Sequence, residues 1–228
     1  MSRRVPEVAI VVGVLLSLTW LVFPPLVGEY ELLTEPVPFL GYVTVAVALC
    51  YPFAAYTCWR AEDPDDTLLP RPILAVAAVI GAGCAVVGAV GGAPLLGLVV
   101  GLLVVVPPAA YALAYHAISP PPQPTLAAGA ALAVAAVTAG LVVGQPYRAG
   151  LVAVLAFVPA LAAFDRLAGN RLPAQVVIGG TALATLVVSG VALALASPLA
   201  HMLAAGLTVA FGGLIAVRIV GEKGRSVV

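Results

Sequence analysis

The sequence predicts an all-α integral membrane protein, in which eight transmembrane helices form a single domain over residues 1–228. Composition, the length of the apolar runs and the distribution of positive charge lead to this fold class. Hydrophobic residues make up 63% of the chain and charged residues 9%, whereas a soluble globular domain is about 25% charged. So few charges could not cover a surface in water, but apolar side chains can face outward into hydrocarbon.

Eight apolar runs have the length that a membrane crossing requires, which is about 20 residues. Proline, glycine or clustered charges separate them, as expected at joints between helices. A single helix over 73–118 would be about 69 Å long at about 1.5 Å per residue, over twice the hydrocarbon thickness of about 30 Å. The first run is too long for the apolar core of a signal peptide, so we expect it to be retained. The predicted helices are 5–27, 37–59, 73–90, 94–118, 125–144, 149–165, 174–196 and 199–220.

The positive charges predict the orientation of this bundle. Alternate joints must lie on the same side, and this division places nine of the ten cations on one side and only Arg148 on the other. Because Lys and Arg are enriched in cytoplasmic loops, we expect both termini in the cytoplasm and the protein in the cell (cytoplasmic) membrane. Nine of the ten cations are Arg, and Ala, Val and Gly are abundant, which suggests a GC-rich prokaryotic gene. The net charge is zero, so no basic excess points to nucleic acid as a partner.

A spacing of 52 residues recurs along the chain. It separates Pro94, Pro146 and Pro198, which all open a turn on the side away from the cytoplasm. The same spacing relates Gly88 to Gly140, Gly92 to Gly144, Pro107 to Pro159 and Arg166 to Arg218. We therefore predict four αα-hairpins arranged as parallel repeats, since each unit holds an even number of helices. Convergence among similar apolar hairpins is the alternative explanation.

Prolines inside the predicted helices indicate kinks, because proline removes a backbone hydrogen bond and clashes with the preceding turn. Kinks at similar depth in several hairpins would either line a central cavity or be inherited packing features. The candidate kink and cavity-lining residues are Pro52, Pro107, Pro108, Pro159, Tyr56 and Tyr111.

Glycines four residues apart lie on one helix face and allow two backbones to approach closely. We expect these contacts to form within the chain, with a homo-oligomer as the alternative. The candidate packing residues are Gly88, Gly92, Gly97, Gly101, Gly140 and Gly144.

No catalytic, cofactor or metal site is predicted. No ionisable residue falls near the centre of a predicted helix, which argues against a proton-coupled transporter, an ion pump or a voltage sensor. His116 and His201 are expected on opposite sides of the membrane, too far apart to share a metal. We expect Asp165 to form a structural ion pair with a neighbour such as Arg171, and the acidic segment 62–66 to be a solvated loop that lacks the pattern of an EF-hand.

The sequence alone favours a non-catalytic scaffold or accessory subunit of a membrane complex, with the lipid bilayer and another membrane protein or a second copy as its partners. Two alternatives stay open. The repeats and kinks would suit a transporter or channel for a neutral or lipidic small molecule. A membrane enzyme with a site at the cytoplasmic surface would use Asp165, His116 and the acidic loop.

Overall fold

The computed structural model describes residues 5–26, 36–60 and 68–169, together with single positions between 173 and 190. Every regular element in the three described ranges is a helix. The expected helix over 199–220 lies outside the described residues, as does nearly all of the one over 174–196. The helices are α1 (Val5–Leu26), α2 (Pro36–Arg60), α4 (Pro70–Val90), α5 (Pro94–Ala114), α6 (Pro122–Val143) and α7 (Pro146–Leu167).

Prolines open five of these helices, since the first residues of α2, α4, α5, α6 and α7 are Pro36, Pro70, Pro94, Pro122 and Pro146. A proline fits the first helical turn because its missing N–H has no partner there in any case. Three of the expected helices, 73–90, 125–144 and 149–165, therefore start three residues too late. Their prolines had been interpreted as turn residues, but they belong to the helices.

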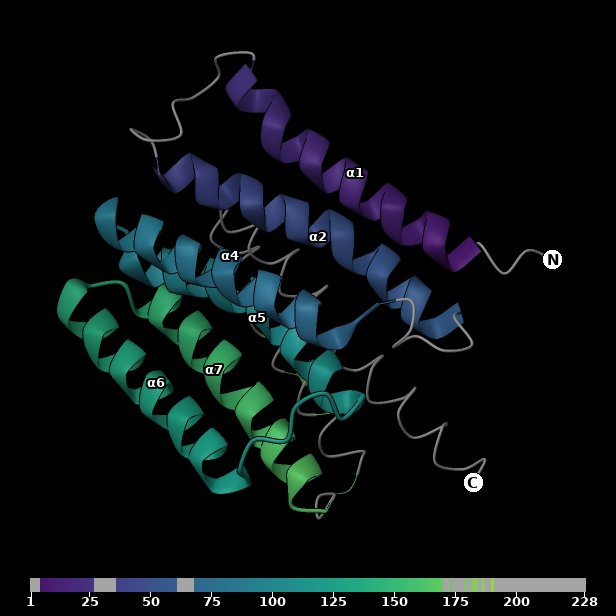
Figure 1. Ribbon diagram of the computed structural model, residues 1–228. Helices are drawn as coiled ribbons and strands as arrows, with labels where there is room; N and C mark the ends of the chain where they lie inside the picture. Colours follow the sequence, from purple (N-terminus) through teal and green to yellow (C-terminus); the bar gives the residue numbers. More distant parts are fainter. Residues whose placement is uncertain are drawn as a thin grey trace.

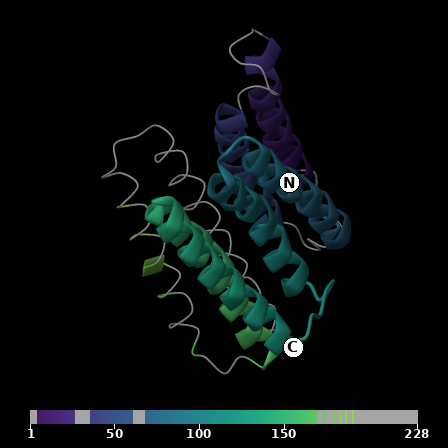
Figure 2. The ribbon, with the colours of Figure 1, turned by 90° about the vertical axis from the view of Figure 1, so that its left-hand side faces the viewer.

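The helices form three antiparallel hairpins that lie side by side in chain order (Figures 1 and 2). The α4–α5 hairpin is in the middle, with α2 packed on one side of it and α7 on the other. α2, α5 and α7 finish at one end of the bundle, where α4 and α6 begin (Figure 1). We call this the arginine end, because Arg60, Arg71 and Arg166 lie there, while Arg148 lies at the opposite end.

The outer faces of the bundle are apolar. Val90 is 86% exposed and Val142 is 87% exposed, and α1, α4 and α6 each carry several further exposed valines and leucines. So continuous an apolar surface is unfavourable in water but is solvated well by the hydrocarbon of a bilayer. Within the described residues α2, α4, α5, α6 and α7 are long and apolar enough to cross a membrane, and α1 is apolar over Glu7–Phe23. The chain is therefore a helical, multi-pass membrane protein.

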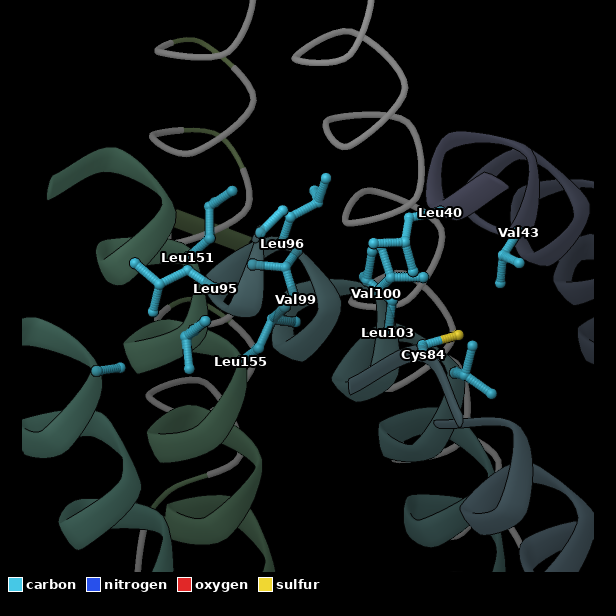
Figure 3. Close-up of a cluster of buried hydrophobic side chains, with 14 of the residues drawn as sticks. Leu40, Val43, Cys84, Leu95, Leu96, Val99, Val100, Leu103, Leu151 and Leu155 are labelled. Atoms are coloured by element: carbon cyan, nitrogen blue, oxygen red, sulfur yellow. The ribbon is translucent and has the colours of Figure 1, made fainter. Parts of the chain in front are cut away.

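The core is built around α5. Leu96, Val99, Val100 and Leu103 of this helix are fully buried and meet side chains from α2, α4 and α7. Figure 3 shows these leucines and valines between Leu151 and Leu155 of α7 and Leu40 and Val43 of α2, with Cys84 of α4 beside them. α5 is thus the one described helix surrounded mainly by protein, and α2, α4 and α7 pack against it.

The turns before α5 and α7 have the same backbone geometry. Gly92 and Gly144 adopt the left-handed conformation, with φ of 73° and 71°. The residue after each has nearly the same dihedral angles, φ −123° and ψ 54° at Ala93 and φ −120° and ψ 56° at Gln145. Each of these two residues donates its N–H to the carbonyl five residues earlier, at 2.7 and 2.8 Å. This is the bond pattern of a Schellman motif, in which glycine is favoured at the left-handed position.

Close backbone contacts follow each of these turns. A Cβ added at Gly88 would lie 2.5 Å from the Cα of Gly97, so α4 and α5 touch through their backbones. In the next hairpin a Cβ at Gly140 would clash with the Cβ of Ala149. In lipid, where burial of apolar surface gives no advantage, such close approach supplies the dispersion energy that joins helices. Gly92 and Gly144 have open space around them and act in the turns instead.

α1 is the peripheral helix of the described bundle and packs mainly on α2. A Cβ at Gly13 would lie 2.7 Å from the Cβ of Phe53. The buried Ser17 hydroxyl donates to the carbonyls of Gly13 and Ala46, both at 2.8 Å, and so links the two helices. The rest of α1 is largely exposed apolar surface.

Substitution of two glycines of α4 tests the backbone contact with α5. Gly88→Ala should destabilise the protein by about 1–3 kcal/mol, because the added methyl group overpacks a contact that cannot yield. Gly83→Ala is the matched control, since a Cβ there meets nothing within 4 Å. The control should be neutral or slightly stabilising because alanine is the better helix former. Unfolding in mixed micelles measures both, and equal effects of the two changes would contradict the contact.

Candidate functional site

The centre of α5 contains two consecutive prolines, Pro107 and Pro108. In a regular helix their amides would donate to the carbonyls of Leu103 and Val104, four residues earlier. Both donors are missing, and Val104 also has a proline at its third following position. The Val104 carbonyl therefore has neither an α-helical nor a 3₁₀ donor. An unsatisfied carbonyl in the bilayer core costs several kcal/mol, so a donor from outside the helix is required.

The Tyr51 side chain, which comes from α2, supplies that donor. Its hydroxyl lies 2.7 Å from the Val104 carbonyl oxygen and 3.0 Å from that of Leu103. The shorter distance is to the Val104 carbonyl, which has no backbone donor left in its own helix. The Leu103 carbonyl can still accept from the amide of Val106, three residues later. One phenol therefore covers both carbonyls that the proline pair frees, and it joins the first hairpin to the central helix.

The candidate kink residues occupy different environments. Pro108 is buried, Pro107 and Pro159 are half-buried, and Pro52 is exposed on α2. Tyr56 is half-buried in α2, one turn beyond Pro52.

Tyr111 lies nearer the arginine end of α5 and donates its hydroxyl to the Leu68 carbonyl at 2.8 Å. Its ring packs on that of Tyr115, with centroids 4.7 Å apart. The sequence pointed to Tyr56 and Tyr111, each four residues after a proline, but the residue that bonds to the freed carbonyls is Tyr51. The signal that could have identified it is its position beside Pro52, on a helix that faces α5.

Two arginines bind the end of α5. Arg166 of α7 donates from Nη2 to the Ala114 carbonyl at 2.8 Å, and Arg71 of α4 donates from Nε to the Ala117 carbonyl at 3.2 Å. The last carbonyls of a helix lack intrahelical donors and carry the negative end of its dipole, so cations are favourable there. These contacts join the ends of three helices at the arginine end.

His116 has the unusual backbone conformation of this end. Its φ is 56°, and it is the only non-glycine residue with positive φ in the described part of the chain. The amide of Ala117 bonds to the Ala112 carbonyl at 2.9 Å, so His116 occupies the left-handed position of a Schellman motif. Gly92, Gly144 and Gly169 fill the corresponding positions after α4, α6 and α7. This turn ends α5 at Ala114, and the predicted helix to residue 118 was four residues too long for this reason.

Asp165 and His116, the residues that a surface enzyme would use, lie in different environments. Asp165 is 1% exposed in the last turn of α7, whereas His116 is exposed beyond the end of α5. A carboxyl that water cannot reach is poorly placed to act on a substrate from the cytoplasm. The remaining predicted groups, which are the acidic segment 62–66, Arg171 and His201, lie outside the described residues.

The described residues contain no group of three or more His, Cys, Asp or Glu side chains that could hold a metal ion. Cys50, Cys58 and Cys84 are free thiols. Threonine hydroxyls inside the helices donate to carbonyls of their own helix. Thr44 bonds to the Leu40 carbonyl and Thr57 to the Phe53 carbonyl.

Comparison with known proteins adds no relative. No protein-family model matches the chain, and no characterised protein or solved structure is detectably similar to it.

Substitutions at the left-handed residues after α5 and α6, which are His116 and Gly144, should change the stability of the protein in opposite directions. His116→Gly should raise stability by up to about 1 kcal/mol, because glycine adopts positive φ without steric strain. Gly144→Ala should lower stability by about 1 kcal/mol, since the space around Gly144 is open and only its φ of 71° opposes a side chain. Thermal unfolding measures both changes. A loss of stability in His116→Gly would mean that the imidazole makes a contact worth more than the strain.

Proposed function

We propose that this protein is a non-catalytic scaffold or accessory subunit of a membrane complex. The observation that carries the proposal is the Tyr51 contact, in which the protein's own side chain fills the kink at the centre of α5. A transport path would leave such carbonyls facing water or substrate. The serine and threonine hydroxyls of the described helices are also bonded to backbone carbonyls, which supports a structural role rather than a transport path.

The lipid-facing surface is compatible with this role. α1 packs mainly on α2 and leaves most of its length exposed, and α6 exposes Val134, Leu141, Val142 and Val143. A subunit that binds another membrane protein needs helix faces that are exposed on the outside of its own bundle. The partner that we infer is another integral membrane protein or a second copy of this chain.

We further infer that the full chain has eight helices in four parallel hairpin repeats. The matched dihedral angles at Ala93 and Gln145 support the repeat, because these residues are 52 positions apart. The Gly88–Gly97 and Gly140–Ala149 contacts have the same spacing. An even number of helices would bring the C-terminus back to the side of the N-terminus.

The proposed orientation places the arginine end in the cytoplasm. It follows from the positive-inside rule applied to nine of the ten cations. Arg60, Arg71 and Arg166 are the described members of that group, and Arg148, at the opposite end, bonds to the Gln145 side chain at 3.1 Å. The membrane we infer is the cytoplasmic membrane of a prokaryotic cell.

Native mass spectrometry of the protein, purified gently from its own membranes, tests the scaffold role. We expect a second membrane protein at a fixed stoichiometry, which should be absent when an unrelated tagged multi-pass protein is purified in the same way. A monomer or homo-oligomer that retains one discrete small molecule or lipid would contradict the proposal. That result would favour a transporter or channel and identify its first candidate substrate.

A further inference from the structure

The site where Tyr51 meets the two carbonyls freed by the proline pair has two hydrogen-bond acceptors and one donor, the phenol hydroxyl. Two carbonyls have each lost the amide that would normally serve them, and the oxygen of one hydroxyl group lies 2.7 Å from the Val104 carbonyl oxygen and 3.0 Å from that of Leu103. Val104 lies midway along α5, so this polar site is at the depth where water is scarcest. A buried carbonyl pair of this kind will hold whichever donor reaches it.

The donor comes from a different hairpin from the acceptors. Tyr51 belongs to α2, and Leu40 and Val43 of the same helix meet the core through apolar side chains. Apolar contacts between helices are weakly directional in lipid, because lipid tails solvate the same side chains equally well. The Tyr51 bond is therefore the contact that fixes how α2 sits against α5.

We propose that the Leu103 and Val104 carbonyls form a binding site for a hydroxyl donor at the centre of the bundle, and that Tyr51 is its built-in occupant. In this arrangement Tyr51 is a latch, which holds the α1–α2 hairpin to α5 by replacing amides that Pro107 and Pro108 lack. A vacated site takes a small neutral molecule that bears a hydroxyl group. Two carbonyls are too few to replace the hydration shell of a cation, so a neutral donor fits better. The inference goes beyond the scaffold role and does not depend on it.

A double-mutant cycle between Tyr51 and Pro108 tests the latch. Tyr51→Phe keeps the ring and removes only the hydroxyl, and it should lower the folding equilibrium constant about three- to tenfold. Pro108→Ala restores an amide at position 108 that can donate to the Val104 carbonyl. In that background Tyr51→Phe should have less than about half its effect on the logarithm of the constant, because the carbonyl no longer needs the phenol. Unfolding in mixed micelles of the full chain measures all four proteins.

Tyr147→Phe is the matched control. The Tyr147 hydroxyl oxygen is buried and has no hydrogen-bond partner in the structure as described. Its removal should leave the folding equilibrium unchanged or raise it, because no bond is lost and a buried polar group disappears. The latch is wrong if Tyr51→Phe behaves like this control. It is equally wrong if Tyr51→Phe costs the same with and without Pro108.

Rescue by phenol tests the binding site itself. Tyr51→Ala leaves a space the size of a phenol beside the two carbonyls, comparable to engineered cavities that bind small aromatic molecules. Phenol should raise the midpoint of thermal unfolding of Tyr51→Ala but not of the wild type, in which Tyr51 occupies the site. Toluene has the same shape without the hydroxyl and should give a clearly smaller shift. An equal shift with toluene, or no shift with phenol, would overturn the hydroxyl site.

Discussion

The structure depends on one constraint: in hydrocarbon, every backbone polar group must find its partner within the protein. Regular helices satisfy this requirement along most of the described chain. It fails at Pro107 and Pro108, and there the phenol of Tyr51 reaches across from another hairpin to complete the bonding. The position of α2 against the centre of the bundle follows from this repair. A local defect in one helix thus becomes a tertiary contact between two hairpins.

The same constraint organises the helix ends. Arg166 of α7 binds the last carbonyl of α5, and Arg71 of α4 binds the Ala117 carbonyl just beyond it. Left-handed residues close α4, α5, α6 and α7 and direct the chain into the next segment, with glycine at three of these positions and His116 at the fourth. Small residues then let the paired helices touch through their backbones. The result is a bundle with a rigid centre and an outer surface of valine and leucine that is open to lipid or to another protein.

The sequence predicts the six described helices well, because membrane-crossing length is a strong and simple signal. It misplaces three helix starts by three residues, since Pro70, Pro122 and Pro146 resemble turn residues in sequence but open helices in space. The sequence prediction also extends α5 past His116, because a histidine does not by itself indicate a left-handed backbone conformation.

The candidate site was harder to predict from the sequence. The prolines of α5 were identified from their positions inside an apolar run, but their partner was not. Tyr56 and Tyr111 each follow a proline by four residues in the sequence, whereas the contact of Tyr51 depends on how two hairpins pack. Side-chain reach across a bundle is a property of the tertiary arrangement, and no single-sequence pattern encodes it.

We propose, as the central claim to be tested, that α5, against which α2, α4 and α7 pack, crosses the membrane with its arginine end in the cytoplasm. Single cysteines at its two ends test this most directly, as Gly91→Cys and Ser119→Cys in a chain whose native cysteines have been replaced. Both positions are exposed. In intact cells an impermeant maleimide should label Gly91→Cys at once and Ser119→Cys only after the membrane is opened. Labelling of both from the same side would contradict the account, since α5 would then not span the membrane.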